Sequence, residues 1–203
     1  MASTARPKPF YLSEHDSPAK RQMLKVALEL FVRDGLCETS IRDIANATGY
    51  SNPALYKFFA SKDALAFELF ERCYTWLFKA LDAAYDKDAA YQSNVAAFFK
   101  TAASLMDESL DAVIYVNENL RTFRSRSKRA TKAPSVIALA RRIVEDGKRE
   151  RSVSTAFDTD LVVAMIMGPL GQIARMRYYG DLPGPAASNL APLAQFFKRG
   201  SST

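Results

Sequence analysis

The side chains best suited to chemistry lie in residues 49–59, the stretch GYSNPALYKFF. Asn52 offers a paired hydrogen-bond donor and acceptor, Tyr56 offers a phenol hydroxyl, and Lys57 offers a positive charge. Elsewhere the sequence has no nucleophile elbow, P-loop or His–carboxylate cluster, and the single histidine, His15, lies near the N-terminus. These residue types indicate binding through hydrogen bonds and charge rather than catalysis.

The composition favours an anionic partner and a reducing environment. The 203 residues carry a net charge of +6 with a pI near 9.3. From Met1 to Lys62, nine Lys or Arg accompany six Asp or Glu, and from Arg121 to Arg151 eleven accompany three. Cys37 and Cys73 have no CxxC spacing and no His nearby, so neither a disulfide framework nor a zinc site is expected.

No segment has the length or character of a membrane anchor or a secretion signal. The N-terminus lacks an apolar signal-peptide core, and the longest apolar run, which begins at Leu161, is too short to span a bilayer. We therefore expect a cytoplasmic protein with no membrane contact, no metal and no cofactor.

Helical periodicity runs through the chain, and no sustained alternation predicts a strand. A first helix is predicted to begin at Ser17–Pro18, a cap followed by a favoured first residue, and to end at Gly35. Ser40 and Asp43 form an acidic version of the capping box and predict a second, short helix that ends at Gly49.

The remaining helices follow from caps and breaks. Ser51 or Asn52 caps a third helix, with Pro53 in its first turn. A long fourth helix is expected from Ser61 to about Tyr85, because nothing interrupts the helical pattern there. Further helices are expected at about 91–107, 110–123, 134–149, 159–179 and 187–198. The predicted fold is therefore all-α.

Two short helices joined by a glycine turn and braced by an amphipathic helix make a helix-turn-helix, whose second helix enters the major groove. The segment ALELFVRDGLCETSIRDIANATGYSNPALYKFFASKDAL resembles the N-terminal domain of the TetR family of bacterial transcriptional regulators. The residues that carry the resemblance, in order, are Leu28, Phe31, Gly35, Ser40, Ile44, Ala45, Gly49, Leu55, Tyr56, Phe59, Lys62 and Leu65. We therefore expect a flexible tail over 1–16, a helix-turn-helix DNA-binding domain over 17–62, and a larger helical effector-binding and dimerisation domain over 63–203.

The resemblance places Asn52, Pro53 and Ala54 on the recognition helix. Asn52 has the chemistry of a bidentate adenine reader, and the Ala54 methyl can meet a thymine methyl. Ser40 and Arg42 open the preceding helix, where both can meet phosphate and Arg42 can also reach a base edge.

Phosphate contacts are expected from Tyr56, Lys57 and Lys62. Phe58 departs from the family pattern, in which many relatives carry His or Tyr at this position. Because Phe cannot donate a hydrogen bond, either one backbone contact is absent here or the ring meets a sugar. Leu55 and Phe59 are expected to pack in the core of the domain.

The resemblance also implies an effector pocket and a dimer interface in the C-terminal part. Aromatic and apolar residues suit a mainly apolar ligand, although such residues more often form a plain core. The candidate pocket residues are Phe98, Phe99, Met106, Tyr115, Asn119 and Phe123. The candidate dimerisation residues, on two helices, are Leu161, Met165, Gly168, Gln172, Leu193, Phe196 and Phe197. Gly168 and Gly171 are expected to allow close approach of the two subunits.

The predicted function is a sequence-specific DNA-binding transcriptional regulator. The resemblance implies a homodimeric repressor that a small, mainly apolar effector releases from an inverted-repeat operator in double-stranded DNA. The alternatives are an architectural or recombinase-like DNA-binding protein without an effector, and an all-α enzyme. The basic loop Arg124–Lys132 is expected to be solvated, with an anionic ligand, an acidic partner or flanking DNA as alternatives.

Overall fold

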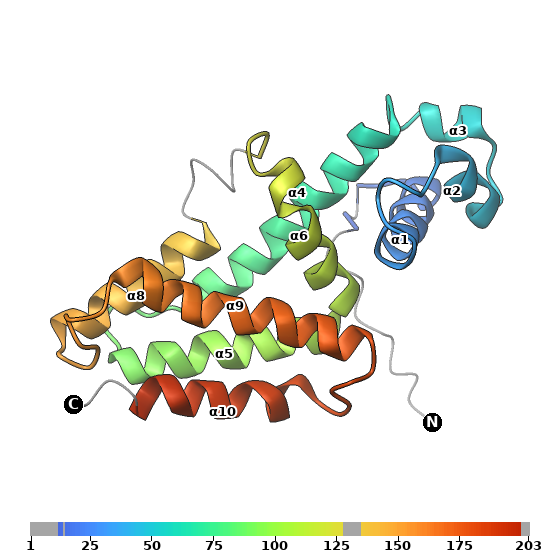
Figure 1. Ribbon diagram of the computed structural model, residues 1–203. Coiled ribbons are helices and arrows are strands. Elements are labelled where there is room, and N and C mark those ends of the chain that lie inside the picture. Colours follow the sequence, from blue (N-terminus) through green and yellow to red (C-terminus); the bar gives the residue numbers. More distant parts are fainter. Residues whose placement is uncertain (1–11, 14, 128–134, 200–203) are drawn as a thin grey trace, which may run out of the picture. The chain divides into compact units, whose positions relative to one another are not determined.

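The computed structural model describes residues 12–13, 15–127 and 135–199, and within these ranges the chain forms helices and no strands, as predicted (Figure 1). Contacts divide the chain into two compact units, Met1–Trp76 and Leu77–Thr203. Across the described ranges, no helix has the length and apolar character needed to cross a membrane.

The first unit begins with α1 (Pro18–Arg33), whose two ends follow the sequence signals. The Ser17 hydroxyl accepts a hydrogen bond from the Lys20 amide at 3.2 Å. Gly35 follows the helix at φ +92°, a left-handed conformation that glycine adopts without steric cost. The buried face of α1 consists of Met23, Leu24, Val26, Ala27, Leu28, Leu30, Phe31 and Val32.

The predicted capping box fixes the start of α2 (Ile41–Thr48). The Asp43 amide donates to the Ser40 hydroxyl at 3.2 Å, and the Ser40 amide donates to the Asp43 carboxylate at 2.8 Å. Gly49 ends the helix at φ +73°, in the left-handed conformation typical of a helix C-terminus. The turn between α2 and α3 is thus set by residues identified in the sequence.

The third helix, α3 (Asn52–Tyr56), is only 5 residues long. Ser51 occupies its N-cap position, but the serine side chain makes no capping hydrogen bond. Leu55 is fully buried, and Phe59, which follows the helix, is also buried. Because so short a helix is unstable alone in water, the burial of these two side chains is what keeps it in place.

The fourth helix, α4 (Lys62–Ala83), is 22 residues long and continues through the boundary between the two units after Trp76. The Ser61 hydroxyl accepts a hydrogen bond from the Ala64 amide at 3.0 Å and so caps its start. The first unit therefore includes the first part of α4, whereas the sequence placed the domain boundary after Lys62.

Four charged side chains, Asp16, Lys20, Glu68 and Arg72, form what we term the charged cluster. The Asp16 carboxylate, only 7 % exposed, accepts hydrogen bonds from both terminal nitrogens of Arg72, at 2.5 and 3.0 Å. Arg72 also donates to Glu68 at 2.6 Å, and the Lys20 ammonium lies 2.7 Å from the Glu68 carboxylate. The hydrogen bond from Arg72 holds the pKa of Asp16 below its ordinary value.

The sequence predicts a flexible N-terminal tail over residues 1–16, and hydrogen bonds attach the last part of this segment to α1 and α4. Residues 1–11 and 14 lie outside the described residues. Ser13 is bound to α1, because the Arg21 Nε donates to its carbonyl at 3.2 Å, and Asp16 is bound to α4. The end of the expected tail is therefore fixed to the first unit.

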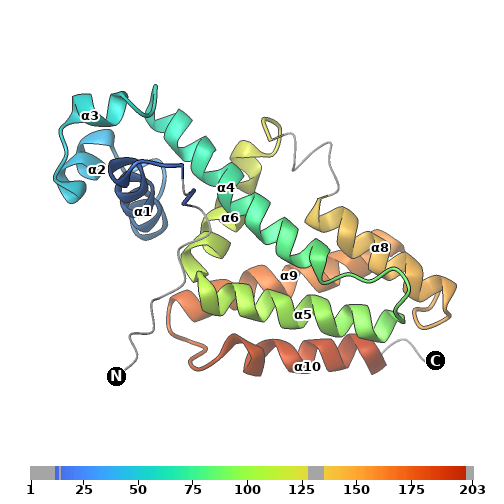
Figure 2. The same ribbon diagram turned by 180° about the vertical axis from the view of Figure 1, so that it is seen from behind.

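The second unit contains five described helices, all close to their predicted bounds. They are α5 (Tyr91–Glu108), α6 (Leu110–Phe123), α8 (Val136–Arg149), α9 (Thr159–Tyr178) and α10 (Ala186–Arg199). In both views α10 lies along α5, and the two helices are in extensive contact (Figures 1 and 2).

Contacts at both ends attach α10 to α5. The Phe197 ring stacks on Phe99 with centroids 5.8 Å apart, and the Tyr91 hydroxyl donates to the Phe197 carbonyl at 3.4 Å. At the other end, the Asp107 carboxylate accepts a hydrogen bond at 2.9 Å from the amide of Ala186, the first residue of α10. A side chain of α5 thus caps α10.

Two residues of the expected dimer face have close neighbours within their own subunit. Phe197 is only 8 % exposed and stacks on Phe99, so its ring belongs to the core of its own subunit. A Cβ atom on Gly171 would lie 2.3 Å from the Asn117 side-chain nitrogen on α6, so this glycine allows close packing within one subunit. At Gly168 a Cβ atom would meet nothing within 4 Å among the described residues.

Replacing Asp16 by Asn should lower the free energy of unfolding of the first unit by on the order of 2 kcal/mol at neutral pH, because Arg72 loses a charged hydrogen-bond partner. The folded-state pKa of Asp16 is lowered, so its contribution is present above the unfolded pKa of about 3.9 and is lost as the pH falls through the folded value. The difference between the wild type and D16N should therefore shrink in acid.

Urea unfolding at neutral and acidic pH measures this difference. Glu38→Gln, which neutralises an exposed carboxylate of the same unit, is the matched control and should be close to wild type at both pH values. An equal loss for D16N at both pH values would contradict the role assigned to the ion pair.

Candidate nucleic-acid interface and subunit surfaces

Most side chains predicted to meet DNA are open to solvent on the first unit. Leu55 and Phe59 turn inward, so α3 shows its other residues to the outside. The exposed candidates are Ser40, Arg42, Asn52, Pro53, Tyr56 and Lys57, and the half-buried ones are Ala54 and Lys62. The structure thus brings together, around α2 and α3, the amide, phenol and basic groups that suit a groove and its phosphates.

The Ser40 hydroxyl is occupied by the capping box rather than directed to a ligand. It donates to the Asp43 carboxylate at 2.6 Å, in addition to accepting from the Asp43 amide. This hydrogen bond lowers the pKa of Asp43. At the start of α2, the exposed Arg42 is therefore better placed to offer charge to a phosphate than Ser40 is.

One member of the charged cluster, Lys20, contacts Phe59, a residue that anchors α3. The Lys20 ammonium lies over the Phe59 ring, 5.3 Å from its centroid, while also pairing with Glu68 of α4. A cation over an aromatic face is attracted by the ring quadrupole. The orientation of α3, and with it Tyr56, therefore depends on groups that lie outside the candidate interface.

Lys62 has a structural partner that the sequence did not reveal. Its ammonium donates to the Leu36 carbonyl at 3.0 Å and to the Cys37 carbonyl at 3.2 Å, both in the loop between α1 and α2. A lysine ammonium has three donors, so one is left for a phosphate. Lys62 is therefore placed to hold this loop and still contact DNA.

Two further aromatic residues are exposed beside α3. Phe58 is 38 % exposed, and its ring centroid lies 6.4 Å from that of Phe59. Tyr50 is 39 % exposed, and sequence reasoning gave it no role. Its position directly after the turn glycine, Gly49, is the signal that could have identified it.

The candidate effector residues are buried in the second unit. Phe98 and Phe99 border a cavity of about 10 Å³ between α5, α8 and α9, a volume that holds about one water molecule. The Asn119 side-chain nitrogen donates to the Tyr115 carbonyl at 2.9 Å, one turn back on α6. All six candidates are buried: Phe98, Phe99, Met106, Tyr115, Asn119 and Phe123.

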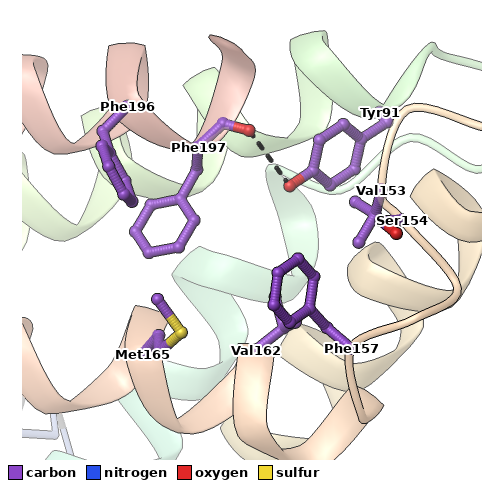
Figure 3. A pocket seen from close by; sticks show the side chains of 8 residues that line it. All are labelled: Tyr91, Val153, Ser154, Phe157, Val162, Met165, Phe196 and Phe197. Atoms are coloured by element: carbon purple, nitrogen blue, oxygen red, sulfur yellow. Dashed lines mark hydrogen bonds between the residues drawn. The ribbon is translucent and has the colours of Figure 1, made fainter. Parts of the chain in front are cut away.

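A larger hollow, of about 160 Å³, opens on the surface of the second unit (Figure 3). Aromatic rings and the Met165 side chain surround it, and Ser154 adds one hydroxyl. Its lining residues are Tyr91, Val153, Ser154, Phe157, Val162, Met165, Phe196 and Phe197. The sequence did not predict this hollow, because its residues come from α5, the segment after α8, α9 and α10.

The predicted dimerisation stripe on α9 is exposed. Leu161, Met165, Gly168 and Gln172 are all open to solvent, and Phe196 is exposed on α10. Leu193 is half-buried. Large apolar side chains exposed together on one surface commonly mark a protein–protein contact.

The basic loop Arg124–Lys132 is only partly described, because residues 128–134 lie outside the described residues. Arg124 and Arg126 are exposed, and the Arg126 guanidinium lies 5.5 Å from the centroid of the Phe123 ring. The expectation that the loop is solvated stays a prediction.

The sequence has curated relatives among transcriptional repressors. The HTH-type transcriptional repressor KstR2 of Mycolicibacterium smegmatis is 24% identical over 161 residues, which are 73% of this chain and 75% of the relative. KstR2 of Mycobacterium tuberculosis is 30% identical over 101 residues, which are 49% of this chain and 50% of the relative.

Solved structures share the fold at low sequence identity. The ketosteroid transcriptional regulator KstR2 of Mycobacterium tuberculosis has a TM-score of 0.80 at 20% identity, covering 94% of this chain and 98% of that one. FadR from Bacillus subtilis, solved in complex with stearoyl-CoA, has a TM-score of 0.71 at 16% identity, covering 88% and 97%.

The capped α2, the left-handed turn and the inward anchors of α3 define a DNA-binding protein of the helix-turn-helix class. The family profile described as "Bacterial regulatory proteins, tetR family" matches residues 23–69, which contain this arrangement. Residues 23–69 therefore carry a DNA-binding domain of the tetR family, and the chain is a DNA-binding transcriptional regulator rather than an enzyme.

Lys57 and Lys62 should respond differently to truncation. We expect Lys57→Ala to reduce the slope of log affinity against log salt by about 2 for a dimer, since each phosphate contact contributes about 0.9. Lys62→Ala should reduce the slope similarly and also destabilise the fold, because the loop carbonyls of Leu36 and Cys37 lose their donor.

Fluorescence anisotropy with labelled DNA at several salt concentrations, together with thermal unfolding, separates the two effects. Lys100→Ala, which removes an exposed lysine of the second unit, is the control and should leave both quantities unchanged. A changed sequence preference with an unchanged salt slope would rule out the phosphate role of the lysine concerned.

Proposed function

We propose that this regulator is a homodimeric repressor that binds an inverted-repeat operator in the cytoplasm and leaves it when a small, mainly apolar effector binds. The observation that carries the proposal is the exposed set of Arg42, Asn52, Tyr56 and Lys57 around a helix that Leu55 fixes from inside. These groups supply both base-edge and phosphate contacts.

The exposed stripe of α9 supports the dimer. Leu161 and Met165 are large apolar residues in solvent, and Gly168 leaves space beside them. A two-fold axis brings the same stripe of two subunits together, which buries these side chains on both. Paired recognition helices then read two half-sites related by the same two-fold axis.

The interior of the second unit supports an apolar effector. Phe98, Phe99 and Phe123 are buried aromatic residues in the region where the family resemblance places the pocket. The similar structures include a ketosteroid regulator and a FadR–stearoyl-CoA complex. A ketosteroid is largely hydrocarbon, and stearoyl-CoA carries a long hydrocarbon chain on a charged CoA group. Release from DNA requires the effector to bind better to a conformation that does not fit the operator.

Selection of bound sequences from random DNA tests the operator. The expected result is an inverted repeat whose half-sites have equal weight. Stearoyl-CoA and a ketosteroid are then added to the complex with the selected DNA, and release by either supports the effector. An asymmetric or sequence-independent outcome would instead favour an architectural DNA-binding protein.

Introducing a charge into the α9 stripe should separate the subunits. We expect Met165→Asp to shift the protein from dimer to monomer and to weaken operator binding by at least about a hundredfold, since burying an unpaired charge costs several kcal/mol and one half-site is lost. Sedimentation velocity and operator binding measure the two effects.

Ser104→Asp provides the control for this variant, because Ser104 is exposed on α5 of the same unit and lies outside the stripe. It should remain dimeric and bind DNA normally. If M165D also stays dimeric, the α9 stripe is not the interface.

A further inference from the structure

The exposed large apolar side chains of the first unit fall within one short segment, residues 50–58. Among its described residues, they are Tyr50, Tyr56 and Phe58. An aromatic residue left in solvent is unremarkable singly, but a group of them on one surface indicates a contact. Tyr56 already belongs to the candidate DNA contacts, which raises the question of what Tyr50 does beside it.

The backbone holds Tyr50 rigidly between α2 and α3. Gly49 is left-handed, and the Tyr50 amide donates to the Ala45 carbonyl at 3.1 Å, which completes the hydrogen-bonded end of α2. On the other side, the Ser51 carbonyl accepts from the Ala54 amide at 2.9 Å. The backbone on both sides of Tyr50 is therefore already ordered before a partner binds. Binding through this tyrosine avoids the entropic cost of ordering that backbone.

The Tyr50 hydroxyl is available to a partner. Its side chain makes no hydrogen bond to any of the described residues, and 39 % of the residue is exposed. A phenol combines an apolar ring, which can rest on sugar, with a hydroxyl that can donate to a phosphate oxygen. The adjacent recognition helix brings the DNA backbone to this side of the unit.

We propose that Tyr50 positions the DNA-binding unit by donating its hydroxyl hydrogen to a backbone phosphate at the edge of the groove that α3 enters. The proposal rests on the DNA binding described above and adds a residue to it. The contact is neutral, so it releases no counterion and leaves the salt slope unchanged, unlike the contacts of Lys57 and Lys62. It is also independent of sequence, because phosphate carries no base information.

Tyr50→Phe is the decisive variant, because it removes one hydroxyl and keeps the ring. Tyr179→Phe is the matched control, since Tyr179 is an exposed tyrosine of the second unit. Both variants and the wild type are titrated with selected operator and with scrambled DNA at several salt concentrations. Ethylation interference then identifies the phosphates that each protein needs.

We expect Y50F to bind about tenfold more weakly per half-site to operator and scrambled DNA alike, as for loss of a hydrogen bond to a charged group. Its salt slope should match the wild type, and one phosphate per half-site should lose its interference signal. Y179F should behave as wild type in every measurement.

Equal affinities and equal interference patterns for Y50F and the wild type would overturn the inference. The inference would also be overturned if Y50F lost affinity only for DNA that carries one particular base pair, because the hydroxyl would then contact a base rather than a phosphate. If the wild type itself selects no DNA, the proposed function fails and this inference fails with it. If the wild type selects DNA and Y50F binds that DNA equally well, only this inference fails.

Discussion

The burial of Leu55 and Phe59 is the interaction on which the DNA-binding surface depends. Fully burying such side chains stabilises by about 1.5–3 kcal/mol each, whereas ordering backbone costs about 1–2 kcal/mol per residue. For the 5 residues of α3 these two side chains do not suffice alone. The left-handed Gly49 before the helix and the Lys20 ammonium over the Phe59 ring after it are two further local constraints on its position.

The position of α3 also depends on α4, through the side chains of the charged cluster. Lys20 contacts both Phe59 and Glu68, and Arg72 connects Glu68 with Asp16. The position of α3 is thus tied to α4 by charged groups, and Lys20 is the member seen over the anchor Phe59. Because α4 continues into the second unit, the first unit shares one helix with the part of the chain that carries the candidate effector residues.

Local chemistry explains what the sequence could predict. Ser17, Ser40 with Asp43, and Gly49 act on neighbouring backbone, so residue type and spacing were enough to place the helix ends they control. The same reasoning identified Leu55 as an anchor. Where a side chain finds its partner far along the chain, spacing carries no information.

Three residues show this limit. Lys62 binds carbonyls in the preceding loop, Gly171 makes room for Asn117, and Phe197 stacks on Phe99 of another helix. Each had the type expected of a phosphate or dimer contact, and each has a partner in its own subunit that the sequence could not show. The surface hollow was missed for the same reason, since its lining comes from four separate segments.

The attachment of α10 at both ends has a consequence for how the second unit opens. Asp107 caps its first turn, Phe197 stacks on Phe99 near its end, and the Arg177 guanidinium lies 3.0 Å from the same Asp107 carboxylate. Detaching the start of α10 therefore breaks the Asp107 cap and the hydrogen bond that Arg177 of α9 donates to Asn189 of α10 at 2.9 Å, and detaching its end exposes an aromatic stack. The C-terminal helix should consequently open as one cooperative unit rather than fray residue by residue, and its amides should share a single slow rate of hydrogen exchange.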